Sequence, residues 1–147
     1  MKLEIGGGYA SWDGFTNLDP VHGEGEFRCR IQDGIPLPER SVLEARCSHL
    51  MEHIPAGPER IAVFNDVYRV LVPGGTFEVI VPLVGQGWGA YADPTHVSFW
   101  VKESFGYLTG ALRANADYGI SYWELAEWTE RPCDWGIEGR ALLRKPQ

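Results

Sequence analysis

The spacing of hydrophobic and polar residues predicts a chain that passes repeatedly between short strands and helices. Apolar runs at residues 2–5, 15–18 and 41–48 predict three strands. Residues 26–31 alternate apolar and charged side chains, which predicts a further strand with one solvent-exposed face. Residues 58–71 carry apolar side chains at helical spacing, begin with Pro58 and are followed by Pro-Gly-Gly, so they predict the clearest helix of the chain.

The second half of the chain predicts a buried strand, a loop, a helix and a final hairpin. The strand covers residues 77–83, the loop 84–98, the helix 102–114, and the hairpin strands 118–129 and 137–144. Strand–helix units followed by a hairpin predict an α/β fold whose sheet is mostly parallel with an antiparallel C-terminal hairpin. The length of 147 residues fits one domain over residues 1–147.

Composition narrows the choice of partners and compartment. The formal net charge is −7 and lysine and arginine do not cluster, which disfavours a nucleic-acid partner and favours a small molecule. No apolar run approaches the ~20 residues of a membrane span, and the N-terminus does not have the pattern of a signal peptide. Cys29, Cys47 and Cys133 lack the spacing of a disulfide framework or a zinc site. We therefore expect a cytoplasmic protein without a metal site.

Glycines and carboxylates follow three successive predicted strands. A glycine turn at 6–8 lets the backbone approach a ligand closely, Asp19 is placed to accept hydrogen bonds from ribose hydroxyls, and Asp33 with Gly34 is placed to contact an adenine. Each feature also has a plain explanation as a tight turn, a turn cap or an Asp-Gly turn. Their order along the chain favours an adenosine-containing ligand over three unrelated turns.

Several segments match one enzyme family. They are Glu4-x-Gly6-x-Gly8-x-Ala10, Asn17-Leu18-Asp19, Asp33 to Pro38, Ser-His-Leu-Met-Glu-His-Ile at 48–54, Tyr-Arg-Val-Leu-Val-Pro-Gly-Gly at 68–75, and Asp-Pro-Thr-His at 93–96 followed by Phe99 and Glu-Ser-Phe at 103–105. With these segments the chain resembles the class I S-adenosylmethionine-dependent methyltransferases of the type 11-like group. The match covers about residues 2–108, and the rest agrees only in the expected layout of strands.

The resemblance implies a Rossmann-like fold, S-adenosylmethionine as cofactor, and methyl transfer to a small-molecule or sugar-like acceptor. It implies cofactor contacts from Glu4, Gly6, Gly7, Gly8, Asp19, Asp33 and Gly34, with Ser48 and His49 at the methionine end of the cofactor.

The chain departs from the family in its first crossover. Ten residues separate Gly8 from Asp19, too few for a helix of about eleven residues together with its connections. We therefore expect a loop or a single turn there, reduced helical cover on one face of the sheet, and a homodimer that shields this face.

Candidate catalytic groups follow the later strands. His49 and His96 are candidate pocket-lining residues or general bases, and Asp93 is placed to orient His96. Glu52 and His53 are expected to pack or to cap the next segment. The aromatic residues of the same loop are expected to wall an acceptor pocket or to pack in the core: Trp88, Tyr91, Phe99 and Trp100.

Two other functions remain open at this point. One is a non-catalytic cofactor-binding or partner subunit that keeps the fold, which the shortened crossover favours. The other is a nicotinamide-dinucleotide enzyme, because a glycine turn and a ribose-binding acid serve both cofactors. The segment 48–54, Asp33 and the incomplete G-x-G-x-x-G spacing argue against the second.

Overall fold

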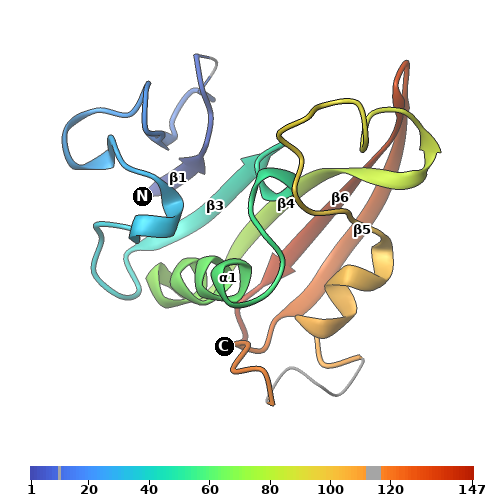
Figure 1. Cartoon of the computed structure of the whole chain (residues 1–147). Coiled ribbons are helices and arrows are strands. Elements are labelled where there is room, and N and C mark those ends of the chain that lie inside the picture. Colours follow the sequence, from blue (N-terminus) through green and yellow to red (C-terminus); the bar gives the residue numbers. More distant parts are fainter. Residues whose placement is uncertain (10, 112–116) are drawn as a thin grey trace.

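A computed structural model of the chain describes residues 1–9, 11–111 and 117–147 and has a six-stranded sheet at its centre (Figure 1). The strands are β1 (Lys2–Ile5), β2 (Thr16–Leu18), β3 (Val42–Ser48), β4 (Leu71–Gly87), β5 (Glu124–Cys133) and β6 (Gly136–Arg144). They lie in the order β2-β1-β3-β4-β6-β5. The first four are parallel, and β6 pairs antiparallel with both β4 and β5. The predicted mostly parallel sheet with an antiparallel C-terminal hairpin is confirmed.

The helix α1 (Pro58–Val70) covers one face of the sheet (Figure 1). Its apolar side chains Val63, Phe64, Val67 and Val70 are buried, and their spacing puts them on one face of the helix. The ring of Phe64 packs edge-on against Phe77 of β4, with 5.8 Å between the ring centroids. These contacts join helix and sheet in one hydrophobic core.

The opposite face of the sheet carries a row of charged side chains. Glu4, Arg46, Glu78, Arg140 and Glu127 alternate in sign across the neighbouring strands. Arg46 Nε lies 3.2 Å from a carboxylate oxygen of Glu78, and Arg140 Nη1 lies 2.9 Å from one of Glu127. Charged residues there agree with the expected loss of helical cover, and no helix lies among the described residues between β1 and β2.

The prediction of a strand at residues 26–31 is wrong. Two 3-10 helices lie in this region, η1 (Gly25–Phe27) and η2 (Ile31–Asp33). The alternation has another cause, because Phe27, Cys29 and Ile31 pack against the core from a turning segment. The turn is held at the end of β2, where the amide of Asp19 donates to the carbonyl of Phe27 over 3.1 Å.

Three further boundaries differ from prediction. The strand predicted at 77–83 extends over all of β4, and the helix predicted at 102–114 is a 3-10 helix, η4 (Lys102–Tyr107), with residues 112–116 outside the described part of the chain. The strand predicted at 118–129 starts at Glu124, because the preceding segment is tied to α1. There, Asn65 donates to the carbonyl of Gly119 over 2.7 Å and accepts from the amide of Ser121 over 2.9 Å. Among the described residues, no helix has both the length and the hydrophobicity that crossing a bilayer requires.

Candidate functional site

A cleft lies at the carboxyl ends of β1, β2 and β3. The chain passes from β1 to β2 on one side and reaches β3 on the other, so the strand order reverses here, which is where open α/β sheets bind ligands. The cleft has a volume of about 220 Å³ and is called the switch-point cleft below. Its lining residues are Ile5, Gly6, Leu18, Pro20, Arg30, Ile31, Gln32, Leu50 and His53.

The glycine turn after β1 keeps this cleft open. Gly6 has φ +71°, and a Cβ at this position would come within 3.0 Å of the Leu50 side chain that lines the cleft. A Cβ at Gly7 would come within 2.9 Å of Asn17 Oδ1. A side chain at Gly6 or Gly7 would therefore press on a neighbouring side chain, and Gly8 has φ +57°. Ala10, the last residue of the matching motif, lies outside the described residues.

Asp19 joins the loops that follow β1 and β2. Its carboxylate accepts from the amides of Gly8 (3.2 Å), Val21 (2.8 Å) and His22 (2.8 Å), and the residue is 8% exposed. Burial on its own would raise the pKa of Asp19, but these backbone N–H groups and His22 bring the pKa below its ordinary value. The carboxylate thus stays charged and shapes both loops beside the cleft.

The other predicted cofactor residues are divided between the cleft and the open sheet face. Asp33 is exposed and follows Gln32, which lines the cleft, and Gly34 has φ +99°. Glu4 lies elsewhere, on the charged face, where its carboxylate accepts from the amide of Trp12 over 2.6 Å. Ser48 lines a hollow of this same face together with Trp12 and Arg46.

A second pocket of about 350 Å³, called the histidine pocket below, adjoins the switch-point cleft. Its lining residues are His49, Glu52, His53, Pro82, Trp88, Gly89, Ala92, Asp93, His96 and Trp135. They come from the segment after β3, from β4 and the loop after it, and from the β5–β6 turn. His53 lines both hollows. The structure therefore brings together the three residues predicted to be catalytic, His49, His96 and Asp93.

His49 lies between two carboxylates. Its Nδ1 is 3.2 Å from Glu52 Oε1, and its Nε2 is 2.9 Å from Glu138 Oε2. The hydrogen bond with Glu52 raises the pKa of His49; burial opposes the shift, and Glu138 adds to it. The residue also has φ +54°, a strained value for a side chain other than glycine. This environment favours the imidazolium form, which suits an oriented positive charge better than a proton acceptor.

The segment Asp93-Pro94-Thr95-His96 folds over the pocket. Asp93 Oδ1 accepts from the amide (2.8 Å) and the hydroxyl (2.6 Å) of Thr95, and these bonds lower the pKa of Asp93. Thr95 Oγ1 lies 3.0 Å from Nδ1 of His53, and His96 Nδ1 lies 3.0 Å from the carbonyl of Ala90. The loop thus orients two imidazole rings that meet edge to face, with 4.8 Å between their centroids.

The sequence analysis expected Glu52 and His53 to pack or to cap and did not place them in a pocket wall. Both line the pocket, and Glu52 is 1% exposed. The sequence feature that could have indicated this position is that both residues come soon after a strand end, as His96 does after the next strand. Of the four aromatic residues, Trp88 lines the pocket, Tyr91 and Phe99 pack on each other near the surface, and Trp100 is in the core.

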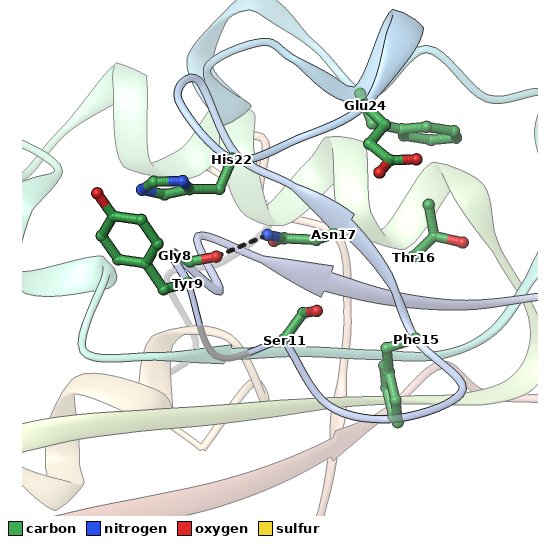
Figure 2. A pocket seen from close by; sticks show the side chains of 9 residues that line it. Gly8, Tyr9, Ser11, Phe15, Thr16, Asn17, His22 and Glu24 are labelled. Atoms are coloured by element: carbon green, nitrogen blue, oxygen red, sulfur yellow. Dashed lines mark hydrogen bonds between the residues drawn. The ribbon is translucent and has the colours of Figure 1, made fainter.

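A further hollow lies beside the edge strand β2, with a volume of about 530 Å³ (Figure 2). Figure 2 shows the Tyr9 and His22 rings close together at one end, where their centroids are 3.7 Å apart, and Asn17 donating to the carbonyl of Gly8. This hollow lies against the edge strand of the sheet and shares no lining residue with the switch-point cleft or the histidine pocket.

No protein-family model matches the sequence, and no curated protein is significantly similar to it. Solved structures are similar over nearly the whole chain. The 1,6-didemethyltoxoflavin-N1-methyltransferase of Burkholderia thailandensis, solved with S-adenosylhomocysteine, has a TM-score of 0.67 at 18% identity and matches 99% of this chain and 71% of its own. An S-adenosylmethionine-dependent methyltransferase of Methanosarcina mazei has a TM-score of 0.63 at 13% identity, over 99% and 92% of the two chains.

The fold is that of the class I S-adenosylmethionine-dependent methyltransferases. A third similar structure with this methyltransferase fold is the 4+2 cyclase SpnF, with a TM-score of 0.62 at 14% identity over 99% of this chain and 74% of its own. The methyltransferase fold thus occurs with more than one named activity, and the function of this chain has to be argued from its own site.

Proposed function

We propose that the chain binds S-adenosylmethionine in the switch-point cleft and transfers its methyl group to a small-molecule or sugar-like acceptor in the histidine pocket. One observation carries the proposal: the two hollows lie at the carboxyl edge of the parallel strands and share His53 as a wall. A donor site and an acceptor site that touch are what a direct group transfer between two bound molecules requires.

Residues in and beside the cleft support cofactor binding. Gly6 lines the cleft as backbone without a side chain, and Gly7 and Gly8 continue the same turn. Asp19 holds the adjoining loops, beside the position proposed for the ribose, and Asp33 with Gly34 follows the cleft residue Gln32. Asp19 accepts three hydrogen bonds, so its two oxygens retain lone-pair capacity for a hydroxyl. When bound, the cofactor supplies an electrophilic methyl group on a sulfonium. Glu4 and Ser48, which the resemblance assigns to the cofactor, lie at the open sheet face and do not line the switch-point cleft.

The residues of the histidine pocket serve the acceptor. His49, held between Glu52 and Glu138, places a fixed positive charge in the wall. His96 donates from Nδ1 to a carbonyl, which leaves a lone pair on Nε2 for an acceptor proton, and Asp93 lies 3.8 Å from that nitrogen. Trp88 and Trp135 supply flat apolar surface for the body of the acceptor.

Calorimetry with S-adenosylhomocysteine tests the cofactor site. The Gly6→Ala substitution puts a methyl group against Leu50 in the cleft and should weaken binding by about tenfold or more. The Gly14→Ala substitution is the matched control, because Gly14 also has a positive φ, +81°, but faces open space. Absence of binding to the unsubstituted chain, or equal weakening by both substitutions, contradicts the proposal.

A non-catalytic cofactor-binding or partner subunit is the second candidate function. The open sheet face favours it, because a face without helices is available to another chain. Binding of S-adenosylhomocysteine without turnover on a panel of hydroxyl and amine acceptors supports this candidate, whereas turnover on any of them excludes it. A homodimer through the same face and a cytoplasmic location stay predictions.

A further inference from the structure

We propose that Glu52, His53 and His96 bind one divalent transition-metal ion in the histidine pocket. Each residue offers one ligand atom, and the three atoms lie within 4.8 Å of one another. Three ligands at this separation can meet one ion after small side-chain rotations, since metal–nitrogen and metal–oxygen bonds are about 2.0–2.2 Å long. The proposal departs from our sequence-based expectation of a chain without a metal site.

The hydrogen bonds around His53 fix which nitrogen is free. The Thr95 hydroxyl donates its proton to Asp93 over 2.6 Å, so the oxygen of this hydroxyl accepts from His53 Nδ1 over 3.0 Å. His53 therefore carries its proton on Nδ1 and has a lone pair on Nε2. A metal-binding histidine typically donates its second N–H to a protein oxygen in this way.

A hydrogen bond orients His96 in the same manner and leaves its Nε2 free. Its Nδ1 lies 3.0 Å from the carbonyl of Ala90, and a carbonyl can only accept, so the proton is on Nδ1 and the lone pair on Nε2. The segment Asp93-Pro94-Thr95-His96 thus supplies one ligand directly and orients another through Thr95. That gives a physical reason for these residue types at this spacing.

Glu52 supplies the negative charge of the site. Its surroundings also give a second, independent indication that a binding partner is missing. The residue is 1% exposed, and within the described part of the chain its Oε2 atom has no hydrogen-bond partner. Its other oxygen lies 3.2 Å from His49. An unpartnered carboxylate oxygen in the interior is destabilising, and a bound cation would remove this cost.

Two imidazoles and one carboxylate are the protein ligands of catalytic zinc sites and of iron(II) sites that keep coordination positions open. Here the ion faces a pocket whose wall includes His53, which also lines the switch-point cleft. We assign the open positions to an oxygen of the acceptor, a role that rests on the proposed function. In the metal-bound chain the Nε2 lone pair of His96 binds the ion, so the base role proposed for His96 above applies to the metal-free chain only.

Titration calorimetry with Zn²⁺ tests the site on the full chain. We expect one ion per chain, and His53→Ala or His96→Ala to weaken binding by about 100-fold or more, because each removes one of three ligands. His22→Ala is the matched control, since His22 is a partly buried histidine beside Tyr9 in a different hollow. Circular dichroism checks that each variant is folded. Zn²⁺ binding that is absent, or that survives both substitutions, overturns the proposal.

Thr95 gives a test that leaves all three ligands in place. Thr95→Val removes the hydroxyl that orients His53 and should weaken Zn²⁺ binding by about 10–100-fold, whereas Thr95→Ser keeps the hydroxyl and should restore it. Thr95 is exposed, so neither substitution opens a cavity in the core. Equal Zn²⁺ affinity of the valine and serine variants overturns the assigned orientation of His53 and with it the site.

Calorimetry with S-adenosylhomocysteine on the same preparations separates the two proposals. Zn²⁺ binding without S-adenosylhomocysteine binding contradicts the proposed function and leaves the metal site standing. S-adenosylhomocysteine binding without Zn²⁺ binding overturns the metal site and leaves the proposed function standing.

Discussion

Asp19 connects two loops at the tip of the sheet. Its carboxylate accepts three amide hydrogen bonds, one from the loop after β1 and two from the loop after β2. Asp19→Ala leaves these amides without an acceptor, and we expect the free energy of unfolding at pH 7 to fall by about 2 kcal/mol. Urea denaturation measures the change, and Asp13→Ala, which removes an exposed carboxylate on the first of these loops, is the control.

The same substitution has a defined pH dependence. The pKa of Asp19 is lowered in the folded chain, so its stabilising contribution is complete above the ordinary value of about 3.9 and is lost as the pH falls through the lower folded-state value. The difference in unfolding free energy between the unsubstituted chain and Asp19→Ala should therefore be constant from pH 7 to about pH 5 and shrink below about pH 4. A difference that is unchanged at pH 3 would count against this account.

Single residues also show how far the sequence can predict the site. The glycine turn and Asp19 are predictable because their roles depend on backbone geometry at a strand end, which is local. The grouping of Glu52, His53 and His96 is not local: it depends on the loop after β4 folding back onto the segment after β3, where the amides of Val97 and Ser98 donate to the carbonyl of Glu52. Hydrophobic spacing contains no information on that contact.

At the scale of elements, α1 organises a segment that has no regular structure of its own. Asn65 on its outer side holds the chain at Gly119 and Ser121 just before β5. Asn65→Ala removes both hydrogen bonds and should lower the free energy of unfolding by about 1–2 kcal/mol. Faster hydrogen exchange at the amide of Ser121 is the specific readout, and Glu59→Ala in the first turn of α1 is the control. Unchanged exchange at Ser121 would show that the segment is held by other contacts.

Elements were predictable where one periodicity dominated. The helix α1 and the strands of the central sheet follow their patterns, with boundaries shifted by a few residues. The segment 26–31 failed because a turning chain that places every second side chain on the core has the same pattern as a strand. The predicted start of β5 is wrong for a different reason. The side-chain amide of Asn65 in α1 forms hydrogen bonds with backbone groups that would otherwise extend the strand.

The whole molecule has one face covered by helix and one covered by ion pairs. Arg46 is nearly enclosed, with the Trp12 ring stacked 3.9 Å from its guanidinium carbon and the Glu4 and Glu78 carboxylates beside it. Arg46→Ala leaves the buried Glu4 without a counter-charge and should lower the free energy of unfolding by about 3 kcal/mol or more. Arg140→Ala, in the same row but 32% exposed, should cost about 1 kcal/mol or less.

Urea denaturation of the two variants side by side measures this contrast. An equal decrease in the free energy of unfolding for both substitutions would mean that burial does not determine how much each ion pair stabilises the chain. The open face would then be stabilised by something other than enclosed charge. The row also explains why a sheet can keep one face without helices, since Arg46 and Arg140 each lie next to at least one carboxylate.

The position of His53 in the walls of two hollows has a thermodynamic consequence. A molecule that shifts this imidazole from one side alters the shape and the charge met by a molecule arriving on the other side. Linkage then requires that each occupant change the dissociation constant of its neighbour by an identical factor, whichever of them enters first. The order in which the two hollows fill is thus a matter of kinetics. The coupling free energy between them has a single value, and it depends on the His53 ring.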